Sequence, residues 1–136
     1  MDKLNIAIAA DENENMWKGH FGDAPVFLKF HVYRCGKCEF AGKQLNTKKD
    51  EDEQHGSETK MHSIKAMLNE FSCAAARVVS ANFKKMAKNT EVQPVVVKNA
   101  ENITAAVEKI ISNYQQLNDM AVKRKNGEKD PVIPEI

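Results

Sequence analysis

The first half of the chain carries hydrophobic patterns that are typical of β-strands. Residues 3–10 form a short, largely apolar run that ends at a polar loop, as expected for a buried strand. Residues 25–34 alternate between two faces with a period of two residues. One of these faces carries Val26, Leu28, Phe30 and Val32. Residues 34–37 include Gly36 and predict a tight turn, so residues 38–45 return as a hairpin partner.

Helical spacing of hydrophobic residues follows in the second half. It predicts one helix over residues 60–71 and a longer one from Ile103 to Leu117. Asn82 is a candidate N-cap for a brief helix over residues 83–89. Between the first strands and these helices, residues 46–55 are polar and highly charged, which indicates a mobile loop.

Two further short strands are expected between the helices, at residues 77–80 and 92–97. Pro94 indicates a sheet edge or a bulge for the second, because proline cannot donate a ladder hydrogen bond. Connections through helices favour parallel neighbours, whereas the first three strands connect as antiparallel neighbours. The pattern therefore predicts an α/β fold with a mixed five-stranded sheet and helices on its faces.

Length and composition narrow this picture. The 136 residues suggest one domain, placed at residues 1–122, before a flexible C-terminal tail over 123–136 that mixes glycine and proline with charges. The net charge of +1 does not indicate the strongly basic surface that binds nucleic acid or an anionic membrane. No apolar run approaches the ~20 residues of a membrane span. The N-terminus has no secretory pattern and the three cysteines are an odd number, so we expect a cytoplasmic protein.

Candidate chemistry is concentrated at a histidine between two glycines, in Gly19-His20-Phe21-Gly22 just after the first strand. Ligands of α/β sheets bind beyond the carboxyl ends of strands, and imidazole is a metal ligand. The expected topology places His20, His55 and the helix start at Asn82 at one pole of the sheet. The competing interpretation is that His20 bonds within a turn and His55 is solvated.

Two cysteines, Cys35 and Cys38, lie across the predicted turn at the other pole. Such a pair is half of a tetrahedral thiolate site for zinc or iron, which a dimer could complete. It is equally typical of a redox pair, or of two free thiols in a reducing compartment. No nucleophile–base trio and no phosphate-binding loop occurs, so the sequence favours a non-enzymatic protein.

The strand over residues 5–9, the segment Gly19 to Phe27 and the later Gln54-His55-Gly56 resemble the dinitrogenase iron–molybdenum cofactor biosynthesis family, which includes NifX, NafY and the C-terminal domain of NifB. The resemblance implies a ribonuclease-H-like fold with sheet order 3-2-1-4-5, flanked by three helices. It also implies an accessory protein that holds or delivers a metal–sulfur cluster, with cofactor-assembly or acceptor proteins as partners. A monomer or a weak homodimer is expected.

The resemblance further implies which residues bind the cluster, with His20 and His55 as metal ligands. The remaining candidates are Phe21, Gly22, Ser80 and Asn82. The family usually carries a glycine pair after its fourth strand, where this chain has Ser80-Ala81-Asn82-Phe83. Glycines would let a bulky anion approach the backbone, and this chain lacks the pair. The expected cargo therefore extends from the iron–molybdenum cofactor and its precursor to a related cluster.

Overall fold

The computed structural model describes residues 3–46 and 71–136. The described strands are β1 (Lys3–Ala10), β2 (Val26–Tyr33), β3 (Cys38–Leu45), β4 (Cys73–Ala76) and β5 (Gln93–Val96). The described helices are the 3-10 helix η1 (Phe21–Asp23) and the α-helices α2 (Ala81–Asn89), α3 (Ile103–Ser112) and α4 (Tyr114–Lys125). Most of the predicted loop at 46–55 and of the predicted helix at 60–71 lies outside the described residues.

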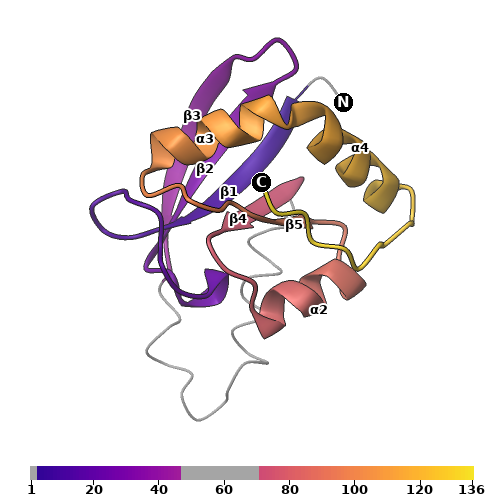
Figure 1. Ribbon diagram of the computed structural model, residues 1–136, viewed down its shortest axis with the longest axis horizontal. Helices are drawn as coiled ribbons and strands as arrows, with labels where there is room; N and C mark the ends of the chain where they lie inside the picture. The colour runs from indigo at the N-terminus through magenta and orange to yellow at the C-terminus, as the bar shows by residue number, and fades with distance from the viewer. Residues whose placement is uncertain (1–2, 47–70) are drawn as a thin grey trace.

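The five strands form one open sheet in the order β3-β2-β1-β4-β5, as Figure 1 shows. β1 pairs antiparallel with β2, and β2 pairs antiparallel with β3. β4 runs parallel to both β1 and β5. The α/β fold with a mixed five-stranded sheet is therefore confirmed, and so is the expected strand order. β5 lies at the end of the sheet, which is where Pro94 can be tolerated.

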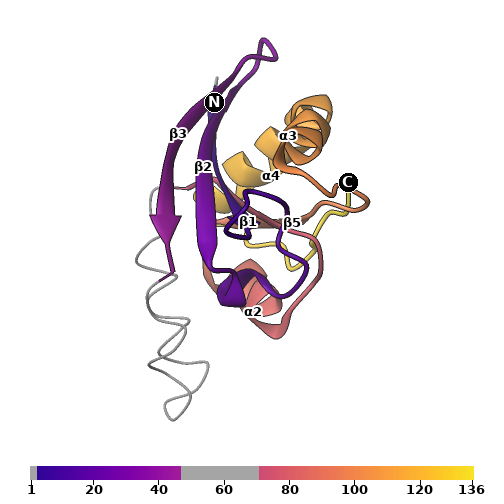
Figure 2. The ribbon, with the colours of Figure 1, turned by 90° about the vertical axis from the view of Figure 1, so that its left-hand side faces the viewer.

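The sheet is buried on both faces at β1, where alternate residues belong to two separate hydrophobic cores. Leu4, Ile6 and Ile8 pack with residues of α3 and α4 on one face. Ala7 and Ala9 pack with residues of α2 on the other. Figure 2 shows α3 and α4 together on one side of the sheet. This two-sided burial explains why β1 is a continuous apolar run rather than an alternating one.

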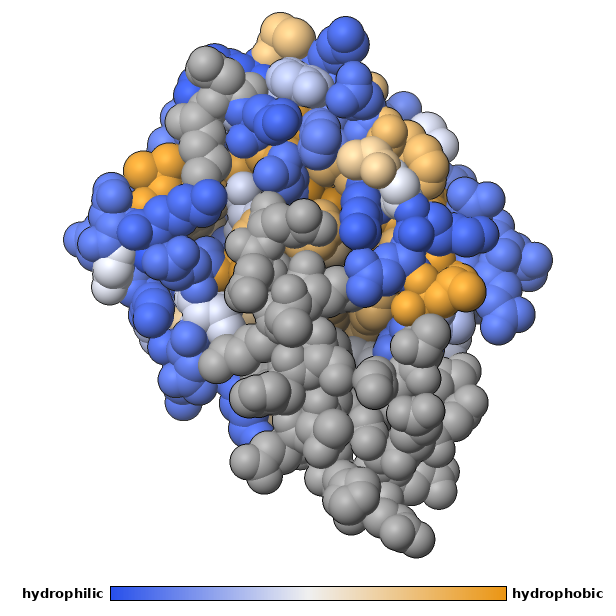
Figure 3. All heavy atoms as spheres, turned by 180° about the vertical axis from the view of Figure 1, so that it is seen from behind, coloured by the Kyte–Doolittle hydropathy of each residue, from blue (hydrophilic) through white to orange (hydrophobic). Residues whose placement is uncertain are grey.

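The surface of the described residues is mainly hydrophilic in the view from behind, where hydrophobic patches are separated by polar residues (Figure 3). The large hydrophobic side chains that remain exposed are Phe40, Leu45, Val78, Val79 and Val132. Within the described residues, no helix combines the length and apolar character that crossing a bilayer requires.

The strand predicted at residues 77–80 is wrong. The strand is β4, Cys73–Ala76, and residues 77–80 form the bend and loop that follow it. The prediction followed the β-branched pair Val78 and Val79, which is partly solvent-exposed. The buried strand instead consists of small side chains, with residues of α3 and α4 packed on one of its faces and residues of α2 on the other.

The brief helix is confirmed, but its cap is Ser80 rather than Asn82. The Ser80 hydroxyl accepts a hydrogen bond from the backbone N–H of Phe83 at 3.1 Å, and α2 begins at Ala81. Asn82 therefore lies inside the first turn. Serine and asparagine are about equally good caps, so helical spacing alone could not choose between them.

The long helix expected from Ile103 to Leu117 is two helices, α3 and α4, that meet at Asn113. The amide of Asn113 donates to the carbonyl oxygen of Lys109 at 2.8 Å and competes with helix continuation. The expected tail is also more ordered than its composition indicates. α4 runs to Lys125, and the backbone of Ile136 donates a hydrogen bond to Val96 of β5 and accepts one from Lys98.

Candidate functional site

The three parallel strands end together at one end of the sheet, which we call the carboxyl end. β1 ends at Ala10, β4 at Ala76 and β5 at Val96, and their parallel pairing brings these ends side by side. Ala10 also pairs with Val26, so β2 begins at the same end. The loops that leave this end occupy the position where open α/β sheets bind ligands.

His20 lies at this end, as predicted. It immediately precedes η1, has an extended backbone and is solvent-exposed, and its side chain makes no capping hydrogen bond. The backbone of His20 does bond within the turn, since its carbonyl oxygen accepts a hydrogen bond from the N–H of Asp23 at 3.1 Å. The role of its side chain as a ligand remains a prediction. An exposed imidazole on a fixed backbone is accessible to a metal of an external ligand.

Phe21 fixes that backbone. Its ring is 1% exposed and packs 4.9 Å from the ring of Phe27 and 5.3 Å from that of Phe83, measured between centroids. The contact with Phe83 joins η1 to α2. Phe21 and the buried Gly22 are thus placed to position His20, and direct contact of either with a ligand remains a prediction.

The N-terminus of α2 lies beside η1 through this ring contact. Ser80 is 5% exposed and uses its hydroxyl for the cap, whereas Asn82 is partly exposed in the first turn. A helix N-terminus favours negative charge through its unpaired N–H groups and its dipole. The structure therefore brings Ser80 and Asn82 close to the segment of His20. His55 lies outside the described residues.

Gly19 has a local explanation that does not need a ligand. A Cβ atom added to Gly19 would lie 3.0 Å from Nε1 of Trp17. The indole packs against the core on the α2 side of the sheet and anchors this loop. Glycine at this position lets the aromatic side chain fold back over the loop. The indole of Trp17 therefore occupies the space beside the backbone that Gly19 leaves open.

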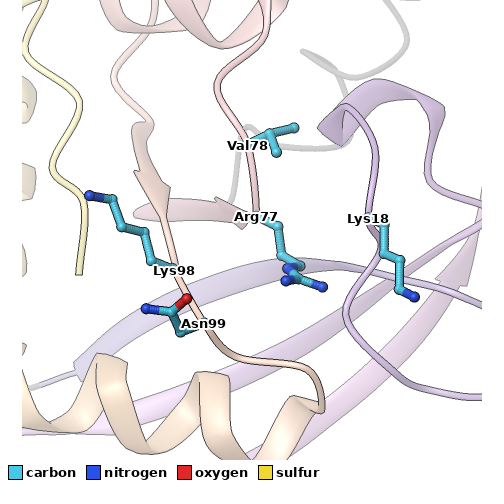
Figure 4. Close-up of a pocket in the computed structure, with 5 residues that line it drawn as sticks. All are labelled: Lys18, Arg77, Val78, Lys98 and Asn99. Atoms are coloured by element: carbon cyan, nitrogen blue, oxygen red, sulfur yellow. The ribbon is translucent and has the colours of Figure 1, made fainter.

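Sequence reasoning missed a second feature of the carboxyl end. Lys18, Arg77, Val78, Lys98 and Asn99 line a cavity of about 390 Å³, which we call the basic pocket (Figure 4). Arg77 directly follows β4, and Lys98 lies two residues after β5. The available signal was the recurrence of a basic residue after a parallel strand. The sequence pattern did not reveal this signal, because it predicts that residues 77–80 form a strand and so places Arg77 inside that strand.

Cys35 and Cys38 lie at the opposite end of the sheet, as expected. They flank the turn between β2 and β3, where Gly36 has a φ of +93° and closes the hairpin. Both thiols are free, and so is the buried Cys73. Among the residues that the structure describes, no group of three or more histidine, cysteine or acidic side chains could hold a metal ion. The zinc or iron site at this turn remains a prediction.

Burial controls the chemistry of these thiols. It raises the pKa of Cys38, the opposite of the shift that activates a redox thiol. It also raises the pKa of Cys73 to about 12, partly offset by the nearby positive charge of Arg124. A thiol with so high a pKa remains protonated and unreactive at neutral pH.

We expect alkylation with iodoacetamide at pH 8 to modify Cys35 first, Cys38 more slowly and Cys73 only after unfolding. Cys35 is exposed, Cys38 is partly buried and Cys73 is buried. Burial also raises the pKa of Cys38 and raises that of Cys73 to about 12, which lowers the fraction of reactive thiolate. Mass spectrometry of timed samples, with a urea-unfolded sample as the control, measures the three rates. Modification of Cys73 in native protein at the rate of Cys35 would contradict the buried position of β4.

A comparison with family models places this arrangement among known proteins. The model described as dinitrogenase iron-molybdenum cofactor matches residues 3–113, which is most of the chain. The match includes the His20 segment, the strand ends and α2. A comparison with curated proteins found no relative that matches. With its sheet order and its carboxyl-end loops in place, this chain belongs to the dinitrogenase iron-molybdenum cofactor family.

Proposed function

We propose that this protein is a non-enzymatic carrier that binds an anionic metal–sulfur cluster at the carboxyl end of its sheet. The cargo is the iron–molybdenum cofactor, its precursor or a related cluster, and the receiver is a cofactor-assembly or acceptor protein. Membership of the family relates the chain to this cofactor. The observation that supports the proposal most is the exposed His20, held beside the N-terminus of α2 by the Phe21–Phe83 contact.

The groups at this end match the chemistry of such a cargo. Imidazole is a ligand for iron and related metals at the surface of a cluster. The sulfides and other anionic groups of the cluster are favoured by a helix N-terminus and by nearby cations. His20 contributes the first interaction and the start of α2 the second, so one ligand can be held by coordination and charge together.

A carrier must also release what it binds. His20 is a single, solvent-exposed imidazole on a short loop, and an acceptor protein can replace it with a ligand of its own. The surrounding backbone is fixed by buried rings, so transfer requires ligand exchange at His20 without unfolding of the sheet. This combination suits a transient site better than a permanent one.

Anaerobic titration with isolated iron–molybdenum cofactor tests the proposal. We expect visible absorbance to co-elute with the protein in gel filtration, and His20→Ala to weaken binding by at least about tenfold because a metal ligand is lost. His31→Ala is the matched control, since His31 lies on β2 and bonds to Glu39 at 3.3 Å. Equal binding by wild type and His20→Ala would remove His20 from the site.

A further inference from the structure

The basic pocket gathers positive charge from three separate segments of the chain. Lys18 comes from the loop after β1, Arg77 from the end of β4 and Lys98 from the end of β5. Figure 4 shows Arg77 and Lys18 extending the same way, with both charged groups on one side of the pocket. The described lining residues include no acidic side chain. Like charges that share a pocket repel each other unless an anion lies between them.

Lys98, the third cation of the basic pocket, already forms an ion pair with Glu135. The ammonium of Lys98 lies 3.0 Å from a carboxylate oxygen of Glu135, on the segment that pairs with β5. Its aliphatic stem lines the pocket while its charge points toward that segment (Figure 4). Both partners are about half exposed. An ion pair of this kind is weak, so Lys98 can be redirected at little cost.

We propose that the basic pocket binds a small anion that carries oxygen acceptors and at least two negative charges. The planar guanidinium of Arg77 matches a carboxylate or phosphate group with two parallel hydrogen bonds. Lys18 adds a second charge, and Asn99, which lies beside Lys98, adds an amide (Figure 4). The pocket has a volume of about 390 Å³ and is open to solvent, so a small anion can enter it. Val78 supplies an apolar wall.

This inference goes beyond cluster binding and does not depend on it. Lys18 is only two residues from His20, so an anion in the pocket would lie near a cluster bound there. The interaction of the pocket with its own ligand nevertheless needs no metal. Metal-free protein can therefore test it, and a failure of cluster binding would leave the result unaffected.

Isothermal titration of the metal-free chain at low ionic strength, with citrate and inorganic phosphate as separate probes, measures the binding. Arg77→Gln removes charge-assisted hydrogen bonds to the anion, so it should weaken binding by about tenfold or more. Arg34→Gln is the matched control, because Arg34 is an exposed arginine at the opposite end of the sheet. Added salt should weaken wild-type binding, since exposed charges are screened.

A second variant tests the pocket in the opposite direction. Glu135→Gln removes the competing carboxylate and frees the ammonium of Lys98, so binding should become about twofold to fivefold tighter. A general loss of structure could not produce this gain. Unchanged affinity would overturn the assignment of Lys98 to the site.

Binding of citrate alone would identify the ligand class as polycarboxylates, and binding of phosphate alone would identify it as inorganic oxyanions. Either result supports the pocket if Arg77→Gln weakens it and Arg34→Gln does not. The proposal is overturned if neither probe binds wild-type protein, or if Arg77→Gln and Arg34→Gln bind as wild type does.

Discussion

Arg124→Met is expected to lower the free energy of unfolding by about 3 kcal/mol or more. The side chain of Arg124 is 1% exposed and lies between α4 and the end of α2. One terminal nitrogen, Nη2, donates to three backbone carbonyl oxygens, of Met86, Ala87 and Thr90, at 3.1, 2.6 and 2.7 Å. The other, Nη1, donates to the carbonyl oxygen of Asp130 at 2.8 Å.

These carbonyls explain why the chain buries a charge. The last carbonyls of a helix have no partner within it, and the C-terminal end of its dipole favours a cation. Burial lowers the pKa of Arg124 from its ordinary value, but an arginine starts so high that it remains charged. Methionine keeps much of the aliphatic packing but removes the donor to the carbonyl oxygens of Ala87 and Thr90, whereas the carbonyl of Met86 keeps its hydrogen bonds from Thr90. The expected loss therefore comes from unpaired polar groups rather than from a cavity.

Urea unfolding followed by circular dichroism measures this effect as a shift of the midpoint at unchanged slope. Lys125→Met is the matched control, because it alters the exposed neighbour of Arg124 in the same helix. Surface substitutions of this kind usually change stability by less than about 0.5 kcal/mol. Equal midpoints for the two variants would show that Arg124 does not hold α2 in place.

Arg124 also shows where the sequence stops predicting the fold. The strands at residues 3–10, 25–34 and 38–45 were predictable because alternation and turn chemistry are local signals. The buried role of Arg124 depends on α2, which lies almost forty residues earlier in the chain. In a segment rich in glycine, proline and charges, a single arginine looks like a solvated residue. That composition therefore predicts a flexible C-terminal tail.

The sequence likewise predicts the position of some residues of the candidate site and not of others. His20 could be placed from one strand end and the connections of the sheet, and the opposite position of the cysteines followed from the hairpin. The basic pocket could not, because the sequence predicts a strand at residues 77–80, whereas β4 spans Cys73–Ala76 and leaves Arg77 in the loop after it. A shift of the strand along the chain changes Arg77 from a strand residue into a loop residue that lines the pocket. Tertiary packing decides where such a strand begins and ends, so local sequence patterns predict these bounds poorly.

Phe21→Ala is expected to lower the free energy of unfolding by about 3–5 kcal/mol, the usual cost of removing a buried aromatic ring. Phe21 contacts both Phe27 and Phe83, so its loss leaves a cavity where η1, β2 and α2 meet. Phe40→Ala is the control, since that ring is 55% exposed on β3 and should cost less than about 1 kcal/mol. Urea unfolding distinguishes the two. Similar losses for both would mean that Phe21 does not anchor η1.

The milder Phe21→Leu variant separates positioning of His20 from stability alone. Leucine retains apolar volume but loses the ring contact that joins η1 to α2, a contact worth about 0.5–1.5 kcal/mol beyond its buried area. Ile110→Val, in the core on the other face of the sheet, is expected to cost a similar amount without touching η1. If the Phe21–Phe83 contact positions His20, Phe21→Leu weakens cluster binding more than Ile110→Val does at comparable stability. Equal binding by the two variants would mean that His20 needs no support from α2, and the proposed site would reduce to the imidazole itself.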